Sequence, residues 1–97
     1  MSRIEVEAAP AEDGWLARVR VGDPGAERRY EVGVSRAELA RFDPGAAEPS
    51  DLVRRSFQFL LEREPKESIL GSFGLSTILR YYPEYEREIR ARFRTRS

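Results

Sequence analysis

The chain contains no histidine and no cysteine. Without histidine it lacks the side chain that most often serves as a general base near neutral pH. Without either residue it can form no disulfide, no zinc site of the ordinary kind, and no iron–sulfur or haem ligation through these side chains. We therefore expect neither a metal nor a cofactor.

Lysine is almost absent as well, because Lys66 is the only one and every other basic residue is arginine. We interpret this bias as the habit of a GC-rich bacterial genome. The alternative is that Lys66 is kept for its titratable amine.

Long apolar runs are also missing, so no segment of about 20 residues could form a transmembrane helix. The first residues show no apolar signal-peptide core. Together with the lack of cysteine, this predicts a cytoplasmic protein with no membrane partner. The 17 basic and 17 acidic residues balance, so no global field steers the protein toward nucleic acid or membrane.

The length of 97 residues fits a single domain over residues 1–97, with strands in about 3–34 and helices in about 35–96. Alternating apolar and charged residues predict three strands, around 4–7, 15–21 and 30–34. Short turns with glycine and proline join them, which favours antiparallel hairpins. We therefore predict an α+β fold: an amino-terminal three-stranded antiparallel meander, with helices packed on one face.

Charged side chains occupy the other face of this meander. They are Glu5, Glu7, Arg18, Arg20 and Glu31. We interpret them as solvated cross-strand ion pairs rather than as a binding surface.

Helix signals follow the strands. Ser35 and Glu38 have the spacing of a capping box, and this first helix should stop at 43–45, which reads Asp-Pro-Gly. Ser50 or Asp51 should cap a second helix that runs to about residue 63. Its apolar residues recur at helical spacing and form one stripe, which we expect to cover the sheet.

The segment 64–86 concentrates apolar residues, four aromatics, two prolines and two glycines. Pro65 suits the start of a short helix through residue 70, and Gly71 suits a left-handed stop. Gly71 to Gly74 reads as a loop, and Ser76 is a candidate cap for a further helix. Pro83 either kinks that helix or separates it from a last one.

Residues 59–70, FLLEREPKESIL, followed by YPEYE at 82–86, resemble a group of small bacterial proteins of unknown function. The likeness covers roughly residues 50–89 and is weaker over the strands. Gly74 stands where such proteins more often have aspartate. The resemblance implies no activity, and no functional residue is carried over from it.

Three aromatic residues are candidates for contact with a protein partner: Phe59, Tyr81 and Tyr85. Phe59 and Tyr81 are displaced from the apolar stripes of their helices, and exposed apolar patches usually mark partners. The competing interpretation is that the tyrosines 81, 82 and 85 mostly fill the core, with one at its edge.

Four arginines near the carboxyl end, Arg90, Arg92, Arg94 and Arg96, are candidates for binding nucleic acid, because a run of guanidinium groups can grip phosphates. The competing interpretation is that arginine complements the negative end of the helix dipole.

The leading hypothesis is a non-enzymatic, cytoplasmic protein-interaction module that binds a protein partner or a second copy through a sheet edge and the aromatic region. The alternative is a small nucleic-acid-associated regulator. An enzyme would need Lys66 or a carboxylate with a strongly shifted pKa in a pocket. Ser68, Ser72 and Ser76 have no base beside them in the sequence other than Lys66.

Overall fold

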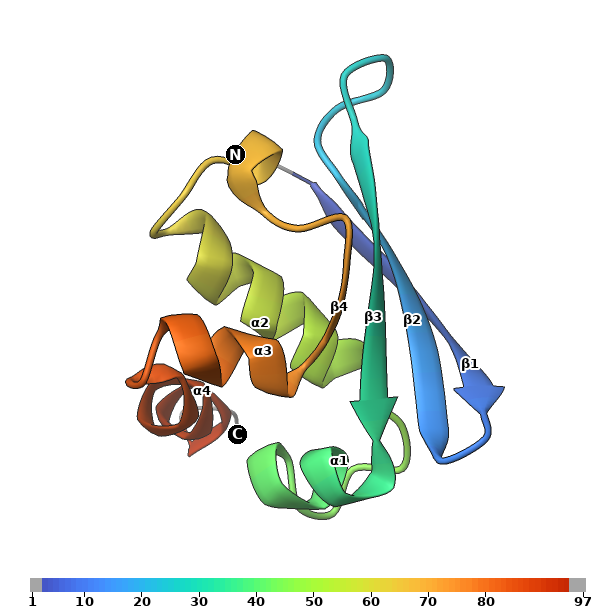
Figure 1. Cartoon of the computed structure of the whole chain (residues 1–97), viewed down its shortest axis with the longest axis vertical. Helices are drawn as coiled ribbons and strands as arrows, with labels where there is room; N and C mark the ends of the chain where they lie inside the picture. Colours follow the sequence, from blue (N-terminus) through green and yellow to red (C-terminus); the bar gives the residue numbers. More distant parts are fainter. Residues whose placement is uncertain (1–2, 95–97) are drawn as a thin grey trace.

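The computed structural model describes residues 3–94, so the predicted site residue Arg96 lies outside the described residues. The fold is α+β, as predicted (Figure 1). The strands are β1 (Ile4–Ala11), β2 (Gly14–Val21), β3 (Arg28–Ser35) and β4 (Ser72–Gly74). The helices are α1 (Arg36–Phe42), α2 (Ser50–Leu61), α3 (Ser76–Tyr81) and α4 (Tyr85–Arg94), with a short 3-10 turn, η1 (Lys66–Ser68).

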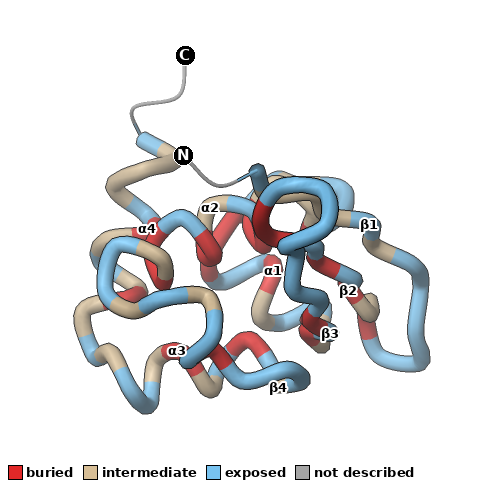
Figure 2. Tube along the Cα trace, turned by 90° about the horizontal axis from the view of Figure 1, so that it is seen from above, coloured by how far each residue is buried: buried red, intermediate tan, exposed pale blue. Residues whose placement is uncertain are grey.

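The first three strands form the predicted antiparallel meander, in the order β1-β2-β3. Val6 pairs with Val19, and Val19 pairs with Tyr30, so the apolar residues share one face. This face packs against the helices, and Figure 2 shows the buried segments gathered there. Burial of this apolar surface is the main driving force for the packing.

Four of the five charged residues predicted to pair on the outer face of the sheet do so, and Glu7 forms no ion pair within residues 3–94. Arg20 lies 3.0 Å from Glu5, and Arg18 lies 3.7 Å from Glu31. These side chains are 45% to 70% exposed, so each pair stabilises the fold only weakly.

The prediction of three strands is wrong, because a fourth strand, β4, pairs in parallel with β3. The Glu31 N–H donates to the Gly71 carbonyl over 2.8 Å, and the Leu75 N–H donates to the Gly33 carbonyl over 2.9 Å. Strand β4 follows Gly71 and ends with Gly74, and the sequence of this stretch is typical of a loop. These residues become a strand only because the chain returns to the edge of β3.

The capping box of α1 is confirmed. The Ser35 N–H donates to Glu38 Oε1 over 2.8 Å, and the Glu38 N–H donates to Ser35 Oγ over 3.0 Å. The helix ends at Phe42, and Gly45 follows with a φ of +91°.

The predicted cap of α2 is wrong. Pro49 is its N-cap residue, and no side chain caps it by a hydrogen bond. Ser50 already belongs to the helix and its hydroxyl donates to Glu48. Asp51 instead pairs with Arg55 one turn later, at 3.4 Å.

The segment after α2 also departs from the prediction. Only Lys66–Ser68 is helical, as a 3-10 turn, and Gly71 does not have a positive φ. Ser76 does not cap α3 either, because Leu75 is the N-cap residue and Ser76 is the first helical one. Pro83 lies between α3 and α4 and separates two helices.

Within the described residues 3–94, none of the helices has the length and apolar character needed to cross a membrane.

Candidate functional site

Phe59 is completely buried, so the prediction that it belongs to an exposed apolar patch for a partner is wrong. Its ring centroid lies 5.7 Å from that of Tyr82 and 5.4 Å from that of Tyr85, both edge-on. The reason is that α2 is covered on two sides, by β1 and by α4. Periodicity indicated one apolar stripe facing the sheet, whereas Phe59 faces the last helices.

Tyr85 is also fully buried and therefore cannot contact a partner directly. Its hydroxyl lies 2.6 Å from Ser56 Oγ. Ser56 Oγ donates to the Leu52 carbonyl over 2.7 Å, which uses its one proton. The Tyr85 hydroxyl is therefore the donor in the pair. Burial raises the pKa of Tyr85 well above its ordinary value.

Tyr81 is the aromatic candidate that the structure places at the surface, with 67% of its area exposed. The prediction of an exposed Tyr81 is confirmed. The other large apolar residue with a comparable exposure in the described chain is Leu70, at 52%. Sequence reasoning did not select Leu70 as a site residue.

The structure does not gather the carboxy-terminal arginines into one cationic surface. Arg90 donates to the Arg41 carbonyl over 2.6 Å and lies 3.3 Å from Glu86. Arg92 lies 2.6 Å from Glu62. Arg94 is exposed near the end of α4. Two of the three described candidates therefore already bind groups of the same chain.

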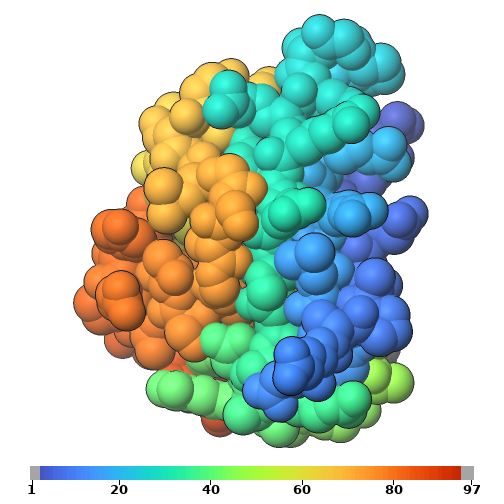
Figure 3. Space-filling view, turned by 45° about the vertical axis from the view of Figure 1, so that its right-hand side comes forward, coloured from blue at the N-terminus to red at the C-terminus, as the bar shows by residue number. Residues whose placement is uncertain are grey.

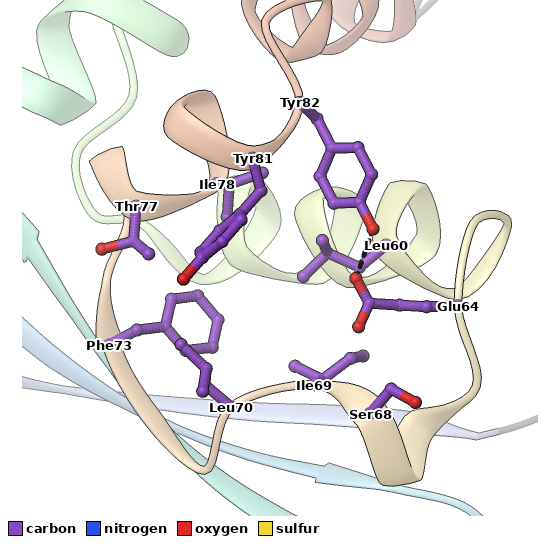
Figure 4. Close-up of a pocket in the computed structure, with 10 residues that line it drawn as sticks. All are labelled: Leu60, Glu64, Ser68, Ile69, Leu70, Phe73, Thr77, Ile78, Tyr81 and Tyr82. Atoms are coloured by element: carbon purple, nitrogen blue, oxygen red, sulfur yellow. Dashed lines mark hydrogen bonds between the residues drawn. The ribbon is translucent and has the colours of Figure 1, made fainter.

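Tyr81 and Leu70 both line a surface pocket of about 360 Å³ (Figure 4). Its wall comes from one continuous part of the chain, residues 60–82, which includes most of the segment that the sequence singled out. The lining residues are Leu60, Glu64, Ser68, Ile69, Leu70, Phe73, Thr77, Ile78, Tyr81 and Tyr82.

Each wall of the pocket depends on a different element. Leu60 comes from the last turn of α2, and Ile69 follows η1. Phe73 lies on β4 and is therefore held in place by the pairing with β3. Ile78 and Tyr81 come from α3. In Figure 4, Tyr81, Phe73 and Leu70 gather on one side, whereas Tyr82 and Glu64 lie on the other.

Glu64 is the one charged residue among those that line the pocket. The Tyr82 hydroxyl donates to its Oε2 atom, and this bond to a carboxylate is the main cause of the raised pKa of Tyr82. Within residues 3–94, no cation lies within 4.0 Å of the Glu64 carboxylate, and its Oε1 atom has no hydrogen bond. Glu64 thus presents a negative group, already held in one orientation, beside an apolar surface.

The enzyme hypothesis named Lys66 or a carboxylate in a pocket, and Glu64 is the carboxylate that lines this one. Lys66 does not line the pocket, and its carbonyl accepts a hydrogen bond of 2.6 Å from the Tyr30 hydroxyl. In the described part of the chain, acidic residues do not cluster in threes that could hold a metal ion.

A second hollow lies over the charged outer face of the sheet, beside Gly71, and its lining includes Glu5, Arg18, Arg20 and Glu31. These four side chains pair with one another, as described above. We therefore take the pocket of residues 60–82 as the candidate site.

Comparison of the chain with protein-family models, with curated proteins and with solved structures finds no match. The resemblance of residues 59–70 and 82–86 to small bacterial proteins stays a prediction.

Proposed function

We propose that this chain is a non-enzymatic protein-interaction module that binds a partner's segment in the pocket of residues 60–82. The expected setting, the bacterial cytoplasm, rests on composition. Phe59 and Tyr85 are buried, so the proposed contact surface no longer includes them. The exposure of Tyr81, together with that of Leu70, supports a surface built on these two residues.

One observation supports this proposal most: the two large apolar side chains with the greatest exposure in residues 3–94 line the same pocket. Single exposed apolar residues are common on protein surfaces, whereas a joined apolar patch usually marks an interaction site. Aromatic residues such as Tyr81 are also enriched among the residues that dominate binding energy at interfaces.

The lining indicates the chemistry of the occupant. A volume of about 360 Å³ is large enough for a leucine or phenylalanine side chain, and it lies near the lower end of the range for small-molecule sites. Glu64 adds a negative charge that forms no ion pair within residues 3–94. We therefore expect a peptide segment that places one large apolar side chain in the pocket and a lysine or arginine beside Glu64.

A selection from a displayed random peptide library tests this. The purified protein should enrich sequences with a large apolar residue next to lysine or arginine. Tyr81→Ala and Leu70→Ala should each weaken binding of the enriched peptide by about tenfold, as expected at an aromatic anchor. Both residues are exposed, so the free energy of unfolding should change by no more than about 0.5 kcal/mol.

Glu64→Gln should reduce the preference for a cationic neighbour, whereas its control Glu67→Gln, at an exposed position outside the pocket, should not. Failure to enrich any motif, or a motif whose binding ignores Tyr81→Ala, would overturn the proposal. Self-association that Tyr81→Ala abolishes, seen by sedimentation, would show that the occupant is a second copy.

A nucleic-acid-associated regulator is the second proposal, and it has less support because Arg90 and Arg92 are engaged within the fold. It predicts that the protein binds a single-stranded oligonucleotide with an affinity that falls steeply with salt. Changing Arg90, Arg92, Arg94 and Arg96 to glutamine should abolish that binding.

A further inference from the structure

The outer edge of β1 is a second surface, at the opposite end of the sheet from β4 and the pocket. In Figure 3, β1 (blue) borders the sheet on the side away from the orange segment that contains β4. The Gly22 N–H donates to the Arg3 carbonyl over 2.9 Å. Because the ladder alternates, the main-chain groups of Glu5, Glu7 and Ala9 also face β2.

The main-chain groups of Ile4, Val6 and Ala8 consequently point away from the sheet. No element within residues 3–94 pairs with this side of β1. Pro10 belongs to the same outward series and has no N–H, so it interrupts the row of donors near the hairpin turn. Natural edge strands often use proline in this way to limit pairing. The open part of the edge is therefore residues 4–8.

The side chains along this edge disfavour a second copy in the registers that pair most of residues 4–8. Antiparallel pairing of two copies centred on Val6 would place Glu5 opposite Glu7 of the second copy, twice. Pairing centred on Glu5 or on Glu7 would place that glutamate opposite itself. Like charges directly opposite each other destabilise a sheet.

A strand of another sequence can complement both the charged and the apolar face of this edge. Glu5 is already 3.0 Å from Arg20, whereas Glu7 has no basic group within 4.0 Å in the described chain. On the other face, Ile4 and Val6 are only partly buried and pack at the margin of the core. A strand with a basic residue opposite Glu7 would pair with that charge. Apolar residues of the same strand beside Ile4 and Val6 would cover these two partly buried side chains.

We propose that residues 4–8 of β1 accept an extended segment of a partner protein, as an added antiparallel strand in which arginine or lysine alternates with apolar residues. Main-chain hydrogen bonds would supply affinity, and the alternation would supply specificity. This surface is independent of the pocket.

The test uses a synthetic peptide, acetyl-Val-Arg-Val-Arg-Val-Arg-amide, and its matched peptide with glutamate in place of arginine. The whole protein should bind the arginine peptide about fivefold more tightly than the glutamate peptide, since one cross-strand ion pair contributes up to about 1 kcal/mol. Amide hydrogen exchange should slow at Ile4, Val6 and Ala8. Equal affinities, or unchanged exchange at these three amides, would overturn the proposal.

Two variants sharpen the result. Ala8→Pro removes an outward N–H that the fold does not use, so it should abolish peptide binding while the protein stays folded. Glu7→Arg should invert the preference between the two peptides, and it keeps the test decisive if Ala8→Pro unfolds the chain.

Tyr81→Ala should not change binding of the arginine peptide, which separates this proposal from the pocket. Self-association that Ala8→Pro abolishes would show that the edge binds a second copy and would overturn it.

Discussion

Glu38 binds the start of two helices with one carboxylate. Its Oε1 atom accepts the Ser35 N–H at the start of α1 over 2.8 Å. Its Oε2 atom accepts the Ser76 N–H at the start of α3 over 3.1 Å, and also the Ser76 hydroxyl. The first backbone N–H groups of a helix have no partner within the helix, and a carboxylate there also complements the helix dipole. Glu38 therefore joins α3, which forms a wall of the pocket, to the end of the sheet.

Replacing Glu38 should accordingly cost more than replacing an ordinary cap. We expect Glu38→Ala to lower the free energy of unfolding by about 2 kcal/mol, since it removes caps worth about 1 kcal/mol each from two helices. Ser35→Ala should cost only about 1 kcal/mol, because α3 keeps its cap. Urea denaturation of the two variants measures the difference. Equal losses would mean that the contact with Ser76 does not stabilise the fold.

The buried Ser56 and Tyr85 hydroxyls should respond unequally to deletion. Tyr85→Phe leaves Ser56 still donating to the Leu52 carbonyl, so we expect a loss of about 1 kcal/mol. Ser56→Ala leaves the Tyr85 hydroxyl buried without an acceptor, and should cost about 1–3 kcal/mol. The double variant should be less unstable than the sum of the two. A larger loss for Tyr85→Phe would contradict the assigned donor.

Stability should fall in alkali. The pKa values of Tyr30 and Tyr85 are raised, mainly by burial, and that of Tyr82 is raised by its bond to Glu64. Above about pH 10, the ordinary tyrosine pKa, the unfolded chain loses protons that the folded chain keeps. The contribution of these groups to the free energy of unfolding is therefore fully present and constant below that pH, and it decreases as the pH rises above it.

Each such tyrosine should contribute a slope of up to about 1.4 kcal/mol per pH unit. Tyr85→Phe should reduce the slope measured by denaturation between pH 9 and 11. An unchanged slope in Tyr85→Phe would show that Tyr85 does not retain its proton.

Gly14 and Gly71 should differ sharply in their tolerance of alanine. A Cβ atom at Gly14, whose φ is +154°, would lie 2.1 Å from the Val34 carbonyl oxygen. Gly14→Ala should therefore cost at least about 2 kcal/mol. A Cβ at Gly71 meets nothing within 4 Å, so Gly71→Ala should be neutral or stabilise by up to about 1 kcal/mol. Thermal unfolding compares the two variants. A large loss of stability in Gly71→Ala would mean that Gly71 adopts the left-handed conformation expected from the sequence.

Local signals predicted the parts of the fold that depend on neighbours in the chain. Alternation along 4–7, 15–21 and 30–34 predicted the meander, its apolar face and its outer ion pairs. The spacing of Ser35 and Glu38 predicted the start of α1. In each case, the residues that interact lie within one segment, or within two segments joined by a short turn.

The candidate site was only partly visible in this way. The sequence singled out 64–86 and selected Tyr81, which is exposed, but it also selected Phe59 and Tyr85, which are buried. It missed Leu70 and Glu64, for which the only signal was their place in or beside the unusual segment. Helical spacing shows which residues share a face, but it does not show how many faces other elements cover.

Residue types and their short-range spacing predicted the chemistry that is open to this protein and its local elements, because both are properties of the chain alone. Long-range packing made β4 a strand, buried α2 on two sides, and placed Glu38 against the start of α3 as well as that of α1. These features need contacts between residues 26 to 41 positions apart. Such contacts form when the whole core is buried, and no local pattern encodes them.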